Sequence, residues 1–243
     1  MRSQRGFTTA GPYFRHISLH GWDHWTEPNR GRGRTMTMVK KITDGQVATA
    51  GVTGLCAGAN VRTPCGERHV EFLRKGDLIV TRDNGLQPVR LVWTRTVSGA
   101  ELAADPSLAP VMLSPRLVGP MMPQKALSVG SAHRLLIPGW RLEDEEDHVS
   151  CLVAARDFPG TETHVPQGDV TYYNVVFDSA QVFAANGLPV ESFAPSQESL
   201  RFVAKSVQEQ LRVAFPDLGP RFKDYPAPRY KLRERVSYTP QFA

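Results

Sequence analysis

The sequence contains few cysteines and no long apolar run. Its three cysteines, Cys56, Cys65 and Cys151, are odd in number and show no CxxC spacing, which argues against a disulfide framework and against a structural zinc site. No apolar stretch approaches the roughly 20 residues that a membrane-spanning helix needs. Arg2 and Arg5 are not followed by the apolar segment of an ordinary secretory signal. We therefore expect no membrane span and a cytoplasmic protein by default, with non-classical secretion left open.

The positive net charge of +5 is concentrated at the N-terminus. Residues 1–35 hold six arginines and two acidic side chains, which leaves 23 basic and 22 acidic residues, a net charge of +1, for the rest of the chain. Nucleic-acid binding usually depends on a basic surface of the folded body. Charge confined to a tail disfavours nucleic acid as a partner, and no other partner is evident from the sequence.

Residues 1–40 are rich in glycine, arginine and aromatic residues without a sustained period, which predicts a disordered N-terminal extension. Met36 and Met38 are alternatives to Met1 as the start of translation. Three histidines follow helical spacing: His16, His20 and His24. Gly21 disfavours that helix, so we expect neither a metal nor another cofactor.

From residue 55 onward, short apolar runs alternate with turn signals. Thr63-Pro64-Cys65-Gly66 has the composition of a tight turn. Asp83-Asn84-Gly85 indicates a hairpin between two apolar runs. This pattern predicts an all-β domain of short strands and hairpins over about residues 50–193.

One long helix is predicted after the β-rich region. Ser196 suits the N-cap position, and Pro216 marks the end. Apolar residues recur between them at helical spacing: Leu200, Val203, Val207 and Leu211. We expect this helix, within residues 194–218, to pack on the β-domain. A basic, proline-rich tail over residues 219–243 is expected to be partly ordered at most.

Three stretches in order resemble the Hint domain of hedgehog and intein proteins, in its compact bacterial form. They run from Cys56 to Trp93, from Leu127 to Ile137, and from Tyr173 to Ser192. The second contains the family's histidine-arginine pair. Together they cover about residues 54–193, and the resemblance implies a flattened all-β fold shaped like a horseshoe or disk.

The resemblance also implies a chemistry. In this family the opening cysteine attacks the carbonyl of the preceding residue, and a histidine protonates the leaving amide nitrogen. In this sequence, the resemblance implies that Cys56 is the nucleophile, that His133 is the acid, and that Leu55–Cys56 is the scissile bond. Ser131, as a hydroxyl near the strained amide, and Asp178, as a group that orients a reacting atom, complete the candidate catalytic set. Water or another external nucleophile would resolve the thioester.

The sequence departs from the family pattern at several positions. The hydroxyl expected three residues before the histidine is replaced by Gly130, and the position of the closing aspartate holds Asn174. The C-terminal hairpin lacks the usual histidines, with Ala180 and Glu191 in the sequence. Ser192 stands in place of the terminal asparagine, so full splicing is excluded.

Two hypotheses follow. The first is a self-processing domain, competent at most for a single-turnover N–S acyl shift and cleavage before Cys56. The alternative is a catalytically degenerate Hint fold that acts as a binding or structural module. In the alternative, Cys56 is a small buried hydrophobic residue and His133 is a hydrogen-bonded core histidine.

Overall fold

The computed structural model describes residues 51–142, 149–219, 221–234 and 236. The chain divides into two units, Met1–Gln46 and Val47–Ala243, and all the described residues belong to the second. The predicted N-terminal extension over residues 1–40, its three histidines included, lies outside the described residues.

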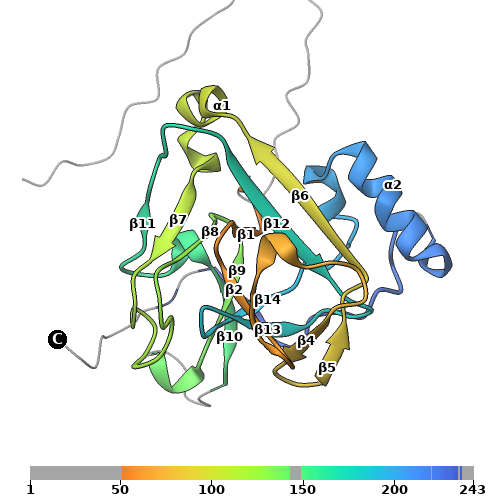
Figure 1. The fold of residues 1–243 in the computed structure, drawn as a ribbon, viewed down its shortest axis with the longest axis horizontal. Coiled ribbons are helices and arrows are strands. Elements are labelled where there is room, and N and C mark those ends of the chain that lie inside the picture. Colours follow the sequence, from red (N-terminus) through yellow and green to blue (C-terminus); the bar gives the residue numbers. More distant parts are fainter. Residues whose placement is uncertain (1–50, 143–148, 220, 235, 237–243) are drawn as a thin grey trace, which may run out of the picture. The chain divides into compact units, whose positions relative to one another are not determined.

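The described strands form two sheets (Figure 1). The six-stranded sheet has the order β11 (Glu162–Thr163), β7 (Pro110–Leu113), β8 (Leu127–Gly130), β1 (Leu55–Cys56), β12 (Val170–Val176) and β6 (Leu91–Val97). The main path of the second sheet has the order β15 (Leu232–Arg233), β10 (Cys151–Ala154), β9 (Arg134–Ile137), β14 (Leu188–Glu191), β13 (Val182–Ala185), β2 (Asn60–Thr63) and β3 (Gly66–His69). Off this path, β4 (Leu78–Thr81) pairs with β13 and with β5 (Gly85–Pro88). The predicted all-β architecture is confirmed.

The hairpin predicted at Asp83-Asn84-Gly85 is present between β4 and β5. Gly85 adopts a φ of 64°, a conformation that a residue without a Cβ adopts freely. The Thr81 hydroxyl donates a hydrogen bond to the Gly85 carbonyl at 2.7 Å. The turn therefore fixes the register in which Leu78 lies opposite Pro88.

The main core contains buried side chains from both sheets. Leu55 and Val129 come from the six-stranded sheet, and Leu135 and Val190 come from the second. Each is at most 1% exposed. Because β1 is only two residues long and lies between β8 and β12, the burial of Leu55 anchors the segment that enters the domain.

A short helix follows β6 and was not predicted. Helix α1 (Gly99–Ala104) begins after Ser98, whose hydroxyl accepts from the Glu101 N–H while the Glu101 carboxylate accepts from the Ser98 N–H. This is a capping box, and the spacing of Ser98 and Glu101 was its signal in the sequence.

The 3₁₀ turns are η1 (Val70–Phe72), η2 (Pro106–Leu108), η3 (Gly139–Arg141), η4 (Ala155–Asp157), η5 (Ser199–Phe202) and η6 (Pro216–Leu218).

The helix predicted after Ser196 is interrupted. Turn η5 is followed by Val203 in an extended conformation, and only then does α2 (Lys205–Ala214) begin. The Ser196 hydroxyl accepts from the Ser199 N–H at 3.1 Å, at the first residue of η5, whereas α2 has Ala204 at its N-cap and no side-chain cap. The continuous helix of the prediction was therefore wrong at its N-terminal half, because apolar spacing alone does not distinguish a helix from a turn and a helix in sequence.

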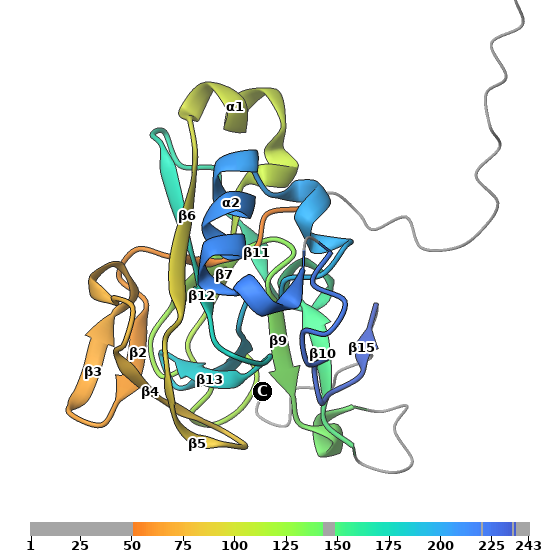
Figure 2. The ribbon, with the colours of Figure 1, turned by 90° about the vertical axis from the view of Figure 1, so that its right-hand side faces the viewer.

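Helix α2 packs on the β-domain, as predicted (Figure 2). Val207 and Leu211 of α2 are buried in one cluster with Trp93 of β6 and Phe193. Among the described residues, no helix has the length and apolarity that crossing a bilayer requires.

Part of the C-terminal tail also packs on this domain. The Tyr225 hydroxyl donates to the Phe177 carbonyl at 3.0 Å, and the Tyr230 hydroxyl donates to the Asp83 carboxylate at 2.8 Å. Strand β15 lies alongside β10, with which it pairs in parallel (Figure 2). Residues 221–234 are thus part of the folded domain.

Replacing Leu211 by alanine tests the packing of α2. Leu211 is fully buried, whereas Val213 on the same helix is 75% exposed. We expect Leu211→Ala to lower the free energy of unfolding in urea by about 2–5 kcal/mol, and Val213→Ala to change it by no more than about 0.5 kcal/mol. Equal, small effects of the two substitutions would contradict the packing described.

Candidate functional site

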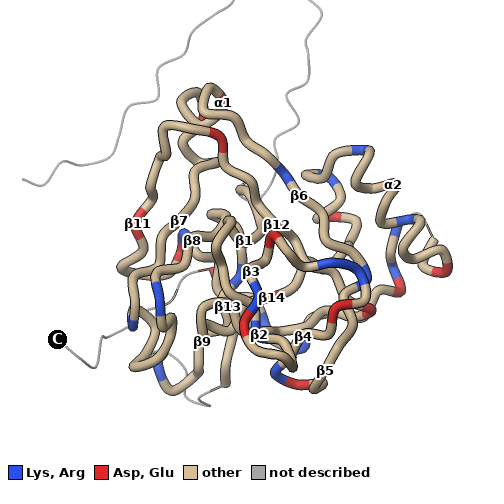
Figure 3. The backbone as a smooth tube through the Cα atoms, in the orientation of Figure 1, with Lys and Arg blue, Asp and Glu red and all other residues tan. Residues whose placement is uncertain are grey.

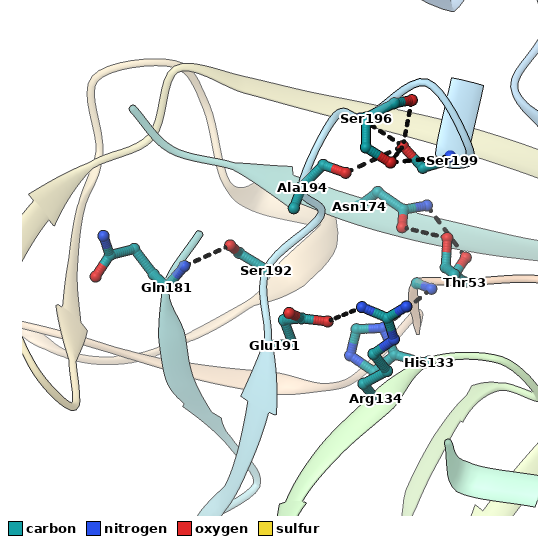
Figure 4. Close-up of polar contacts among 11 residues, drawn as sticks. Thr53, His133, Arg134, Asn174, Gln181, Glu191, Ser192, Ala194, Ser196 and Ser199 are labelled. Carbon is teal, nitrogen blue, oxygen red and sulfur yellow. Dashed lines mark hydrogen bonds and ion pairs between the residues drawn. The ribbon is translucent and has the colours of Figure 1, made fainter. Parts of the chain in front are cut away.

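Buried polar side chains hold the peptide bond between Thr53 and Gly54 at both of its ends (Figure 4). The Gly54 N–H donates to His133 Nδ1 at 3.2 Å. Asn174 Nδ2 donates to the Thr53 carbonyl oxygen at 3.1 Å, and the Thr53 hydroxyl donates to Asn174 Oδ1 at 3.0 Å. One peptide therefore has an imidazole at its amide nitrogen and a hydrogen-bond donor at its carbonyl oxygen.

The order of strands brings these groups together. Gly54 directly precedes β1, which lies between β8 and β12. His133 directly precedes β9, a few residues after β8, and Asn174 lies within β12. Asn174 consequently reaches the chain at Gly54 from the neighbouring strand β12, and His133 reaches it from the turn that connects β8 to β9.

Two glycines allow the backbone segments to approach this closely. The Gly130 N–H donates to the Gly54 carbonyl at 2.8 Å, and the Ala132 N–H donates to the Val52 carbonyl at 3.0 Å. A Cβ on Gly130 would lie 2.2 Å from the Val52 oxygen. The entering backbone thus occupies the space that a side chain at position 130 would need.

Position 54 also accommodates only glycine, for a different reason. Its φ of +121° is a conformation that L side chains rarely adopt, and a Cβ would lie 2.8 Å from Asn174 Nδ2. A cysteine or serine could not stand at this position without moving Asn174 or the backbone.

His133 is 6% exposed, and its pKa is lowered to about 4, first by desolvation and then by the positive charge of Arg134. The ring is therefore neutral at pH 7. Because Nδ1 accepts the Gly54 N–H, the proton of the neutral ring is on Nε2, which has no hydrogen-bond partner among the described residues. In this state Nδ1 has no proton to deliver to the Gly54 nitrogen.

Cys56 lies two residues beyond this peptide. It packs beside Val52 and Tyr172, and burial raises the pKa of its thiol to about 12. Within the described part of the chain, no hydrogen bond joins its sulfur to His133. At neutral pH the thiol is protonated and is a weak nucleophile.

The other residues proposed for the site also make contacts elsewhere. The Ser131 hydroxyl donates to the Ser107 carbonyl at 2.9 Å. The Asp178 carboxylate pairs with Arg90 at 3.1 Å. Leu55 is buried in the core, paired with Val129 and Tyr173 in the sheet. The structure thus brings His133 to the Thr53–Gly54 peptide without joining it to Ser131 or Asp178.

Glu191 has a structural partner near the histidine. Its Oε2 lies 3.2 Å from Arg134 Nη1, the residue after His133 (Figure 4). Burial raises the pKa of the Glu191 carboxyl, although the charge and hydrogen bond of Arg134 oppose this shift. Glu191, whose side chain is 8% exposed, therefore forms an ion pair with an arginine whose side chain is 39% exposed.

Sequence reasoning did not identify Thr53 and Asn174 as partners. From the sequence, Asn174 indicates only the loss of an acidic group, and Thr53 carries no motif signal. Their hydrogen bonds span 121 positions, a separation over which a single sequence gives no pairing signal. Across residues 51–142, 149–219, 221–234 and 236, no group of three or more His, Cys, Asp or Glu side chains is arranged to hold a metal ion.

A sequence model of the Hint domain matches residues 53–197, more than half of the chain. The chain belongs to the Hint domain family. The matched region begins at Thr53, so it includes the Thr53–Gly54 peptide, and it ends within the segment that leads to α2. No curated protein matches the chain.

Solved structures similar to this Hint domain include two inteins and an intein-like domain. The bacterial intein-like domain from Clostridium thermocellum is 14% identical, with 58% of this chain and 99% of that chain covered and a TM-score of 0.38. The gp41-1 intein is 12% identical, with coverages of 58% and 98% and a TM-score of 0.35. The MchDnaB-1 intein is 13% identical, with coverages of 56% and 98% and a TM-score of 0.35.

Adding a methyl group at Gly130 tests the close approach of the entering segment. Gly130→Ala places a Cβ against the Val52 carbonyl, and we expect it to lower the free energy of unfolding by about 3 kcal/mol. Gly168, which has open space around its Cβ position, provides the control, with an expected change for Gly168→Ala within about 0.5 kcal/mol. A Gly130→Ala protein as stable as Gly168→Ala in urea would show that the segment does not approach in this way.

The lowered pKa of His133 predicts a pH dependence of stability. The unfolded chain binds a proton at this residue near pH 6.5, whereas the folded protein does so only near pH 4. The stability contribution is therefore complete above pH 6.5 and is lost as the pH falls toward 4. Between pH 6.5 and 5 the loss is about 2 kcal/mol.

His133→Gln provides the comparison, because glutamine offers an oxygen to the Gly54 N–H and does not titrate. We expect the decrease in the free energy of unfolding between pH 6.5 and 5 to be about 2 kcal/mol smaller in this variant. Glu191 titrates in both proteins, so its opposite contribution cancels in the comparison. Identical pH dependences of the two proteins would contradict the buried, neutral state of His133.

Proposed function

We propose that this Hint domain does not process its own chain and acts as a binding and structural module. The observation that carries the proposal is the contact between His133 and the amide of Gly54, a residue that has no side chain to act as nucleophile. The family's reaction needs a nucleophile, a proton donor and an oxyanion donor around a single peptide bond. Here an imidazole and an amide donor lie at Thr53–Gly54, but the imidazole accepts the Gly54 N–H and the nucleophile position holds glycine.

The geometry supports the proposal that side chains with a structural role occupy positions where the family has catalytic ones. Asn174 forms hydrogen bonds with both the hydroxyl and the carbonyl of Thr53. The space beside Gly130 holds the Val52 carbonyl. Gly54, Gly130 and Asn174 depend on one another. A larger residue at position 130 would collide with the Val52 backbone, and one at position 54 would collide with Asn174. The result is a closed hydrogen-bonded cluster that fixes the chain at the point where it enters the domain.

Cys56 is poorly placed to supply the missing nucleophile. An N–S acyl shift at Cys56 needs an acid at the Cys56 nitrogen, but the imidazole is bound to the nitrogen of Gly54. Leu55 and Cys56 pair in the sheet with Tyr173 and Tyr172. With the thiol pKa raised to about 12, the thiolate fraction at pH 7 is roughly one in 10⁵.

Intact-mass measurement of the full chain tests the proposal. The purified protein and its Cys56→Ala variant are each incubated with dithiothreitol and, separately, with hydroxylamine at pH 7 and pH 8.5. We expect a single species at the mass of the whole chain, 26.9 kDa, before and after incubation in both proteins.

Two cleavage patterns would overturn the proposal, and they differ in meaning. Fragments 1–55 and 56–243, absent from Cys56→Ala, would establish self-processing through a thioester at Cys56. Fragments 1–53 and 54–243 would show instead that the peptide held by His133 and Asn174 is cleaved by an external nucleophile. A His133→Gln variant distinguishes this second outcome from contaminating proteolysis, because only cleavage assisted by the imidazole would stop.

A further inference from the structure

A groove lies between strand β6 and the segment that leads from η5 into α2. Its volume is about 640 Å³, and its wall also includes Gly51 and Leu108. This volume falls within the range of small-molecule sites, about 300–1,000 Å³. The groove is separate from the cluster around Thr53 and Gly54, although Gly51 lies only two residues before Thr53. We refer to it as the β6–α2 groove.

The charged side chains in the wall of the groove are both basic. Arg95 from β6 and Arg201 from η5 line it, and no acidic residue does. Among the described residues neither guanidinium forms an ion pair or a hydrogen bond. Glu101 is close enough to sense the charge of Arg95, but its carboxylate is bound to the Ser98 N–H and hydroxyl. Figure 3 shows basic positions on β6 and on the turns that lead into α2.

The N-terminus of α2 adds further donors at the same place. The ten-residue helix begins after Ala204, which provides no side-chain cap, and its first turn contains no acidic residue. The first backbone N–H groups of a helix have no partner within the helix and carry a partial positive charge. Ala204 and Ser206 line the groove, so the first turn of α2 forms part of its wall.

A tryptophan side chain lies in the same wall. Trp93 lines the groove and is 6% exposed, and its indole Nε1 has no hydrogen-bond partner among the described residues. The Nε1 atom itself has almost no accessible surface, so the indole is a reporter of binding in the groove and not a donor that a ligand reaches. Apolar side chains also line the wall, among them Leu108, Val203 and Val207, together with the hydroxyl-bearing residues Thr94, Thr96 and Ser206.

We propose that the β6–α2 groove binds a small amphipathic oxyanion, with a carboxylate or phosphate group attached to an apolar body. Arg95, Arg201 and the N-terminus of α2 hold the charged group, and the apolar wall receives the rest of the molecule. The inference rests on the proposed function as a binding module, for which it names a site and a ligand class. Guanidinium groups and helix N-termini are both matched to planar or tetrahedral oxyanions.

Nuclear magnetic resonance titration of the full chain provides the test. The ¹⁵N-labelled protein is titrated with 2-naphthoate, with 2-naphthyl phosphate and with the neutral 2-naphthamide. We expect saturable shifts of the Trp93 indole resonance and of the Lys205 and Ser206 amides with the two anions, and binding at least about tenfold weaker for the amide. The relative affinities of the two anions identify the favoured charged group.

Charge-removing variants assign the binding to the groove. Arg201→Gln and Arg95→Gln are each expected to weaken binding of the anions about tenfold. Arg62 is exposed on β2 and is not part of the groove, so Arg62→Gln should bind as the unmodified protein does. Because Arg201 is itself exposed, its variant is expected to fold even if Arg95→Gln does not.

Three results would overturn the proposal: no saturable shift at these resonances, equal binding of the neutral amide, or equal weakening by Arg62→Gln. The outcome is independent of the cleavage assay. A chain that stays intact but does not bind the anions would leave the non-processing domain in place and remove only its ligand. A chain that is cleaved would overturn the proposed function whether or not the groove is filled.

Discussion

The hydrogen bond between the Gly54 N–H and the His133 imidazole is the contact around which the rest of the site is arranged. It requires that the entering backbone lie close to both β8 and β12, and this in turn requires glycine at positions 54 and 130. Once the backbone is there, Asn174 can reach the Thr53 carbonyl. A buried amide and a buried imidazole would each be costly without a partner, so the pairing also stabilises the short strand β1.

The same contact accounts for the electrostatics of the site. Excluding water from His133 keeps the ring neutral, and a neutral ring can accept the Gly54 N–H at Nδ1. Burial acts in the opposite direction on the Cys56 thiol, because it disfavours the charged thiolate. A site that is dry enough to stabilise this hydrogen bond is therefore also one in which Cys56 stays protonated.

Much of the fold could be predicted from local signals. The hairpin at Asp83-Asn84-Gly85 follows from the turn preferences of asparagine and glycine, and the packing of α2 follows from the spacing of Val207 and Leu211. The interruption of the predicted helix at Val203 could not be predicted. The Val203 side chain would be buried equally well within a continuous helix or in an extended residue between a 3₁₀ turn and a helix. For the site, the sequence identified His133 and the substitution at Asn174, but not which peptide these residues would hold. That choice depends on the order of β8, β1 and β12 in the sheet.

By itself the sequence determined the family, the β-rich architecture and the loss of several family side chains, because these depend on residue types and on their spacing along the chain. The tertiary structure alone decided that the imidazole binds the amide of Gly54, with Cys56 two residues away from that amide. It also placed Arg95, Arg201 and the start of α2 around one groove. Both arrangements bring together residues that are distant along the chain, and their positions result from sheet order and from close packing, which depend on the whole domain.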